Sequence, residues 1–148
     1  MRVVQVTEFG GPEVLAVADI ADPRPGAGQV LVRASAVDVL FLDTQLREGW
    51  GKEFFGQAPP YVPGDGVAGE VVSVGEAVDP GWIGRPVVAS TSNGGTYAEL
   101  VVVVSMGTFL SSRARIAAWE LSCHSRRRCA SMGTFVSIRR DAGLGRRA

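Results

Sequence analysis

The strongest constraint on the fold is a succession of short, valine-rich segments through residues 1–104, each ended by glycine or proline. Runs such as Arg2–Thr7, Val14–Ile20 and Val67–Val74 have the length of β-strands and stop before a helix of ordinary length could form. The chain holds 19 glycines and 8 prolines in 148 residues, and these residue types favour turns. The sequence therefore predicts a mainly β fold, a barrel or a sandwich, with one or two short helices.

The turn residues also predict which segments pair. Arg2–Thr7 and Val14–Ile20 flank Phe9–Pro12 and should form a hairpin, because the glycines of that turn tolerate a positive φ. A helical turn is expected at Asp43–Trp50, with Asp43 as N-cap and with Leu42 and Leu46 on one side. A loop rich in proline and aromatic residues is expected over 54–63. The remaining strands are expected at Gln29–Ala36, Val67–Val74, Arg85–Ala89 and Tyr97–Val104.

Charge changes sign near Val104. Residues 1–104 carry thirteen acidic and six basic side chains, a balance of −7. Residues 105–148 carry nine arginines against Glu120 and Asp141, a balance of +7. We therefore expect one domain over residues 1–104 and a basic tail over residues 105–148, irregular or with a single helix at Ser112–Leu121.

Several protein classes are excluded by what the chain lacks. It opens without the basic start and apolar stretch of a secretory signal, and no run approaches the roughly 18 apolar residues of a membrane span. Both cysteines, Cys123 and Cys129, lie in the tail, which argues against a disulfide scaffold. We expect a cytoplasmic protein with no membrane partner.

Five sequence blocks in register carry a family resemblance. They are Thr7–Leu15, Gly28–Arg33, Phe41–Gly49, Pro63–Gly75 and Gly94–Glu99. Together they resemble the N-terminal part of the quinone oxidoreductase branch of the medium-chain dehydrogenase/reductase superfamily. The resemblance implies a GroES-like β-barrel that packs against a Rossmann domain. In the cleft between the two domains, NADPH would transfer hydride to a quinone or an electron-poor alkene.

The resemblance covers about residues 1–104 and stops there. No Gly-x-Gly-x-x-Gly turn follows a strand, and Gly143-Leu144-Gly145 has no helix after it. We therefore expect only a partial GroES-like barrel, without the Rossmann domain that would hold NADPH, and no activity from this chain alone. Such a barrel would expose strand edges and an apolar interdomain face, so we also expect self-association.

Zinc is not expected in residues 1–104. Zinc-dependent members of the resembled superfamily place cysteine and histidine around the corner that here reads Gly64-Asp65-Gly66. No cysteine occurs before Cys123, so the soft ligands that such a site needs are missing. The resemblance therefore points to the zinc-independent branch.

The candidate residues for the substrate and cofactor cleft follow from the comparison with the resembled enzymes. The resembled enzymes usually carry asparagine where this chain has Leu40, and Asp38 could supply a polar group nearby. Asp43 matches a family aspartate but could equally be a helix cap, and Arg47 could meet a cofactor phosphate or lie in solvent. The aromatic candidates could border a pocket or belong to the core. The full set is Asp38, Leu40, Asp43, Arg47, Tyr61, Gly64 and Tyr97.

The glycines of the block Pro63–Gly75 also have a physical interpretation that does not depend on the resemblance. Gly64, Gly66 and Gly69 should let the backbone bend tightly and approach a neighbouring segment closely. They could serve the barrel corners alone, with or without a ligand.

The tail offers weaker signals. Cys123, His124 and Cys129 could contribute three metal ligands, but structural zinc sites nearly always use four. The arginine clusters suit an acidic partner, although no aromatic platform accompanies them and nucleic acid is not the expected ligand. An alternative function is thus a non-catalytic remnant or interaction module with a basic tail. The segment Ser105–Ser111 recurs almost unchanged as Ser131–Ser137, too few copies for a repeat fold.

One event would account for the tail. Out-of-frame translation of a GC-rich gene produces arginine- and serine-rich sequence and would explain both the charge reversal and the end of the resemblance. We predict that another frame downstream of codon 104 encodes a proline-rich linker followed by a glycine-rich strand–turn–helix. Sequencing of the gene across this point tests the hypothesis, and empty frames would refute it.

Overall fold

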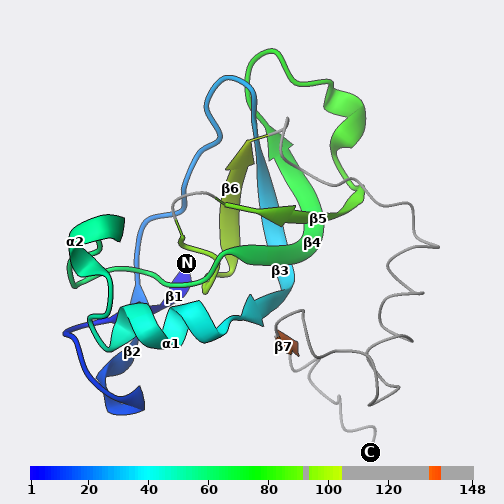
Figure 1. Cartoon of the computed structure of the whole chain (residues 1–148). Coiled ribbons are helices and arrows are strands. Elements are labelled where there is room, and N and C mark those ends of the chain that lie inside the picture. The colour runs from blue at the N-terminus through cyan, green and yellow to red at the C-terminus, as the bar shows by residue number, and fades with distance from the viewer. Residues whose placement is uncertain (92–93, 105–133, 138–148) are drawn as a thin grey trace, which may run out of the picture.

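The computed structural model describes residues 1–91, 94–104 and 134–137. Strands dominate this part of the chain, as the sequence predicts, and only two short α-helices accompany them (Figure 1). The helices are α1 (Phe41–Arg47) and α2 (Lys52–Phe55), and short 3-10 turns lie at Pro12–Val14 and Pro80–Trp82. The strands are β1 (Arg2–Val6), β2 (Leu15–Asp19), β3 (Gln29–Val39), β4 (Gly66–Val74), β5 (Pro86–Ser90), β6 (Leu100–Val104) and β7 (Thr134–Ser137).

The strands form two antiparallel sheets rather than a closed barrel in the described residues. β1 and β2 make the expected hairpin, with Val4 opposite Val17. The second sheet has the order β5-β4-β3-β6, and β7 also pairs with β3. Isolated bridges from Val3 to Ala98 and from Val6 to Tyr61 attach the hairpin to the rest of the domain. The hairpin therefore lies beside the loops that border the ends of the larger sheet.

β3 is the centre of the larger sheet and pairs along both edges. On one edge it pairs with β4 from Val30 to Val37, with register shifts between Leu31 and Val32 and between Ala34 and Ala36. On the other edge Gln29–Arg33 pairs with β6, and Ala36–Val39 pairs with β7. Such irregularities bend and twist a strand, so β3 can carry the chain from the sheet towards α1.

The core is built almost entirely from β-branched side chains. Val32, Val67 and Val87 are fully buried, and the surrounding cluster consists only of valine and alanine. These stiff, compact side chains pack well on a pleated surface. The larger apolar side chains lie elsewhere: Phe41 is 78% exposed and Phe54 is 90% exposed.

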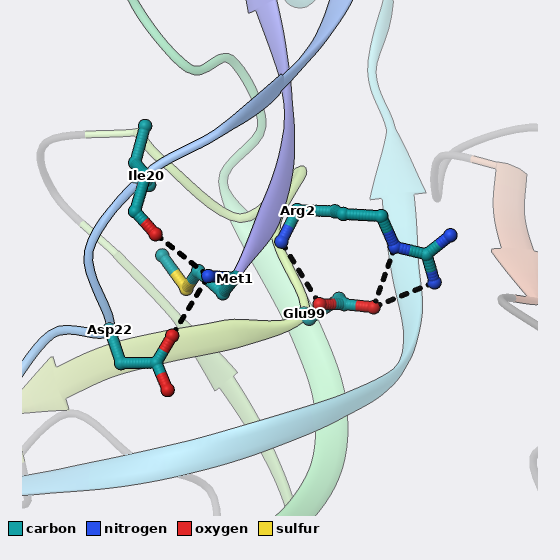
Figure 2. A network of polar contacts seen from close by, with 5 residues as sticks. All are labelled: Met1, Arg2, Ile20, Asp22 and Glu99. Carbon is teal, nitrogen blue, oxygen red and sulfur yellow. Dashed lines mark hydrogen bonds and ion pairs between the residues drawn. The ribbon is translucent and has the colours of Figure 1, made fainter.

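A polar network ties the N-terminal residues to two distant segments (Figure 2). The ammonium group of Met1 donates to the carbonyl oxygen of Ile20 at 2.7 Å and to the carboxylate of Asp22 at 2.9 Å. The Arg2 backbone N–H and guanidinium both donate to Glu99, at 3.0 Å and 2.8 Å. The backbone N–H of Arg2 and then its guanidinium lower the pKa of Glu99. The network thus clamps β1 between β2 and the segment that leads into β6.

The structure corrects several local expectations. α1 begins two residues before Asp43, so Asp43 is not the N-cap, although its carboxylate still accepts from the N–H of Leu40 at 2.9 Å. The expected loop over residues 54–63 begins inside α2. β3 extends to Val39, and β6 begins only at Leu100. Helix length and strand ends depend on tertiary contacts that local pattern does not contain.

The tail contributes a strand that the sequence did not indicate. β7 is the second half of the repeated segment Ser131–Ser137. The helix expected at Ser112–Leu121, the arginine clusters, and Cys123, His124 and Cys129 lie outside the described residues. Among the described helices, none is long and apolar enough to cross a membrane.

The expected close approaches at three glycines are confirmed. A Cβ at Gly69 would overlap the carbonyl group of Arg33 on β3, and a Cβ at Gly66 would meet the carboxylate of Asp38. At Gly64 the backbone has a φ of +95°, and a side chain would collide with Thr96 and Tyr97. These contacts draw β4 and its preceding loop against β3.

We predict that Gly69→Ala destabilises the domain by roughly 1–3 kcal/mol, because β3 and β4 must separate to admit the new methyl group. Gly26→Ala is the matched control, since its Cβ would meet only the flexible end of Gln29, at 3.2 Å. Urea unfolding of both variants measures the difference. Equal stabilities would contradict the proposed backbone contact.

Candidate functional site

A cavity of about 500 Å³ lies between α1, α2 and the loop that leads into β4. One helix contributes Leu42, Asp43 and Leu46, which share a side of α1 as the sequence predicts. Leu40, at the start of α1, and Phe55, at the end of α2, add apolar walls. The loop supplies its polar margin, with Tyr61, Gly64 and Asp65. The cavity therefore has an apolar side and a polar side, and its volume is within the range of small-molecule sites.

Asp43 is the polar residue with the most contacts at this site. It lines the large cavity and also a second one of about 200 Å³, which Arg47 and Tyr97 border as well. Its Oδ2 atom accepts from the N–H of Leu40 at 2.9 Å and from the hydroxyl of Tyr97 at 3.3 Å. Asp43 therefore both stabilises the start of α1 and faces the cavities, so the two interpretations left open by the sequence are compatible.

Three carboxylates surround this corner of the molecule. Burial, and then the nearby charge of Asp38, raise the pKa of Asp43. Burial also raises the pKa of Asp65, with further contributions from Asp38 and Asp43. Asp38 itself is buried on β3 and accepts a hydrogen bond from the N–H of Gly66 at 2.7 Å. The corner therefore disfavours additional negative charge and favours the neutral forms of Asp43 and Asp65.

The two tyrosines differ in their hydrogen bonding. The hydroxyl of Tyr97 donates to Asp43, whereas the buried hydroxyl of Tyr61 has no partner among the described residues. Burial, and then the charge of Asp43, raise the pKa of both phenols, so they stay protonated at neutral pH. Tyr61 is thus a buried donor beside the cavity with its hydrogen bond unused. A buried polar group without a partner is costly and usually has a reason.

Arg47 makes contacts that hold α1 in place. Its Nε atom donates to the carbonyl oxygen of Gly10 at 3.1 Å, and its guanidinium pairs with Glu48 at 3.3 Å. The side chain is only 12% exposed. These contacts fasten α1 to the turn of the β1–β2 hairpin, and they occupy the group that the sequence suggested for a phosphate.

The structure brings the seven candidate residues to one region and adds others. Leu40, Asp43, Tyr61 and Gly64 line the large cavity, Arg47 and Tyr97 border the smaller one, and Asp38 lies behind Gly66. Phe55 and Asp65 were missed by the sequence reasoning. The sequence does show the aromatic pair Phe54-Phe55 and the carboxylate within Gly64-Asp65-Gly66. Neither pattern shows that the chain folds back to bring Phe55 and Asp65 to the same cavity.

Comparison with known proteins identifies the domain. The model of the alcohol dehydrogenase GroES-like domain matches residues 26–111, more than half of the chain. The chain belongs to this family. The resemblance to the quinone oxidoreductase branch is confirmed by a quinone oxidoreductase of Lama guanicoe, which is 41% identical over 102 residues. That alignment covers 67% of this chain and 30% of the relative.

Solved structures agree with the sequence match. A mycobacterial protein complexed with NADPH is 34% identical, with a TM-score of 0.67, over 76% of this chain and 34% of its own. The Escherichia coli quinone oxidoreductase complexed with NADPH is 25% identical, with a TM-score of 0.68, over 77% of this chain and 34% of its own. The chain thus spans about a third of the length of the relatives it matches. The fold is a GroES-like domain, mainly of strands and not closed into a barrel in the described residues.

Neither a metal nor the phosphates of NADPH have an evident site in this part of the chain. No group of three or more metal-ligating side chains occurs among the described residues. No described lysine or arginine lines the large cavity, carboxylates lie at its margin, and Arg47 is already bonded to Gly10. These residues therefore offer no free cation at the cavity for the phosphates of a dinucleotide.

The raised pKa of Asp43 leads to a prediction about stability. Because folding raises this pKa, the contribution of Asp43 to the stability of the wild type falls as the pH rises from below the ordinary aspartate value through the raised pKa. Asp43→Asn removes the charge and keeps an oxygen for the N–H of Leu40. Its stability relative to wild type should therefore increase from about pH 4 to about pH 7.

Asp43→Ala is the control for the hydrogen bond. It lacks the acceptor as well as the charge and should be about 1 kcal/mol less stable than Asp43→Asn at both pH values. Urea unfolding of the three proteins at each pH provides the comparison. A relative stability of Asp43→Asn that falls as the pH rises would show that the sign is wrong.

Proposed function

We propose that this GroES-like domain is the acceptor-binding side of a zinc-independent, NADPH-dependent quinone or enone oxidoreductase. The observation that carries the proposal is the cavity of about 500 Å³, which Leu40, Leu42, Leu46 and Phe55 line together with Tyr61, a residue whose buried hydroxyl has no partner among the described residues. A quinone is a neutral, planar molecule whose carbonyl oxygens accept hydrogen bonds. Its ring therefore suits the apolar walls of the cavity, and its carbonyl oxygens suit the unused donor of Tyr61 once that side chain turns into the cavity.

The residues of the cavity would have different roles. Leu42, Leu46 and Phe55 would hold the ring by apolar contact, and the buried hydroxyl of Tyr61 would turn into the cavity to donate to one carbonyl oxygen. Asp43, with its raised pKa, would hold a proton close to the site, and reduction of a carbonyl to a hydroxyl requires one. The carboxylates would disfavour anionic molecules. We therefore infer selection for uncharged acceptors.

NADPH would supply hydride to the acceptor, and two relatives are described as complexes with it. Among the described residues, no lysine or arginine lines the large cavity. We therefore propose that the chain alone does not hold NADPH for hydride transfer. The division into a domain over 1–104 and a tail over 105–148, and a cytoplasmic location, are further parts of this proposal. A basic tail that binds an acidic partner is the alternative function.

The exposed aromatic face beside the cavity fits the same proposal. Phe41, Trp50, Phe54 and Phe55 are at least half exposed and lie on or next to α1 and α2. Trp50 and Phe55 are in ring contact, with centroids 6.3 Å apart. Exposed apolar clusters of this kind mark interaction surfaces. We infer that a nucleotide-binding domain packs here, and that the face promotes self-association when it is uncovered.

The first test is binding of 1,4-naphthoquinone to the full chain, followed by amide shifts in two-dimensional NMR. We expect shifts at Asp43, Tyr61 and Gly64, and no oxidation of NADPH by the chain alone. Tyr61→Phe removes one neutral hydrogen bond and should weaken binding about two- to tenfold.

Tyr97→Phe is the matched control, because its hydroxyl is already bonded to Asp43 and does not line the larger cavity. It should bind the quinone as the wild type does. Shifts confined to other surfaces, or equal affinities of wild type and Tyr61→Phe, would refute the assignment of the cavity. Oxidation of NADPH by the chain alone would refute the proposed lack of activity.

A further inference from the structure

The edge of β3 that faces away from β4 is divided between two partners. β6 covers Gln29–Arg33, and the N–H of Ala34 donates to the carbonyl oxygen of Glu99 at 3.0 Å. Beyond this point β7 covers Ala36–Val39, with Val37 opposite Val136 and Val39 opposite Thr134. We call Ala36–Val39 the β3 slot. Without β7, the slot would present unpaired backbone groups, which are a template for another strand.

The strand that fills the slot exists twice in the sequence. β7 is Thr134-Phe135-Val136-Ser137, and the earlier copy is Thr108-Phe109-Leu110-Ser111. Three of the four residues are identical, and the fourth exchanges valine for leucine. Pairing along a strand edge uses main-chain hydrogen bonds, so segments this similar can form the same ladder.

Chain length decides which copy can enter the slot of its own molecule. Val104 lies opposite Gln29, ten residues along β3 from Val39, which is about 33 Å of extended strand. Thr108 follows Val104 by only four residues, which span at most about 14 Å. The earlier copy therefore cannot reach the register of β7 in its own molecule, even along a bent β3. Thr134 is joined to Val104 by residues 105–133 and has ample length.

We propose that the β3 slot is a strand-binding site whose second occupant is Thr108–Ser111 of another copy of this chain. The tethered β7 competes for the slot at an effective concentration of the order of millimolar. β7 therefore fills the slot of the wild type at micromolar concentration, and strands exchange with a second copy as the concentration approaches that value. Because Asp38 lies within the slot, opposite Phe135, this exchange takes place on the strand that supports the cavity.

The test removes each occupant separately in the full chain. Val136→Pro places proline within β7, where its fixed φ and missing N–H disfavour strand pairing, so molecules should associate through the earlier copy. We expect the average mass from sedimentation equilibrium at about 100 µM, a tenth of that effective concentration, to exceed that of the wild type. Val136→Pro combined with Leu110→Pro should return to the wild-type mass. Ser125→Pro, which lies outside both copies, is the control and should keep the wild-type mass.

Two further measurements keep the proposal testable if Val136→Pro does not fold. A labelled peptide of residues 105–111 should bind Val136→Pro but not wild type by fluorescence anisotropy, with a scrambled peptide as control. Wild type near millimolar concentration should associate, and Leu110→Pro alone should lower its average mass at that concentration. The proposal is overturned if Leu110→Pro leaves association unchanged, or if Phe54→Ser removes it, because the aromatic face would then be the contact.

Discussion

The close pairing of β3 with β4 is the interaction on which the rest of the molecule depends. It places Val32 and Val67 in a core of compact β-branched side chains, and it requires that Gly69 present no side chain towards Arg33. The same approach brings the N–H of Gly66 onto the carboxylate of Asp38. Because β3 leads into α1 and β4 follows the cavity loop, this pairing also sets the distance between the two walls of the cavity. The site is therefore a consequence of strand packing at one end of the sheet.

Folding shifts the pKa values of the carboxylates of this domain in opposite directions. At the hairpin, Arg2 lowers the pKa of Glu99, and the charged form of Glu99 stabilises the fold. At the cavity, burial and the charge of Asp38 raise the pKa of Asp43 and Asp65, so their charged forms cost stability. Acidification therefore weakens the hydrogen bonds of Glu99 to Arg2, whereas it reduces the repulsion among the carboxylates at the cavity. Buried carboxylates with raised pKa values are typical of sites that bind a ligand or hold a proton.

Much of the fold could be predicted from residues 1–104. The hairpin, the order of the strands and their valine-rich buried faces follow from alternation and turn chemistry, and these are local properties. The start of α1 could not be predicted from Asp43. An aspartate near the start of a helix can be the N-cap itself, or it can follow the N-cap by three residues and accept a hydrogen bond from the N-cap N–H, as Asp43 does from Leu40. The end of β3 at Val39 also depends on β7, a strand nearly a hundred residues later, and local pattern carries no information about that partner.

The candidate site, like the fold, could be predicted from the sequence only in part. Resemblance pointed to Leu40, Asp43, Tyr61 and Gly64, and the structure places all four around one cavity. The role suggested for Arg47 depended on its being free, and only the three-dimensional arrangement shows its bonds to Gly10 and Glu48. With that guanidinium occupied and carboxylates at the margin, the described residues of the cavity offer no free cation for a phosphate. On the proposed function, the two tasks of an oxidoreductase would then be separated: this domain would select the uncharged acceptor, and another surface would hold the charged cofactor.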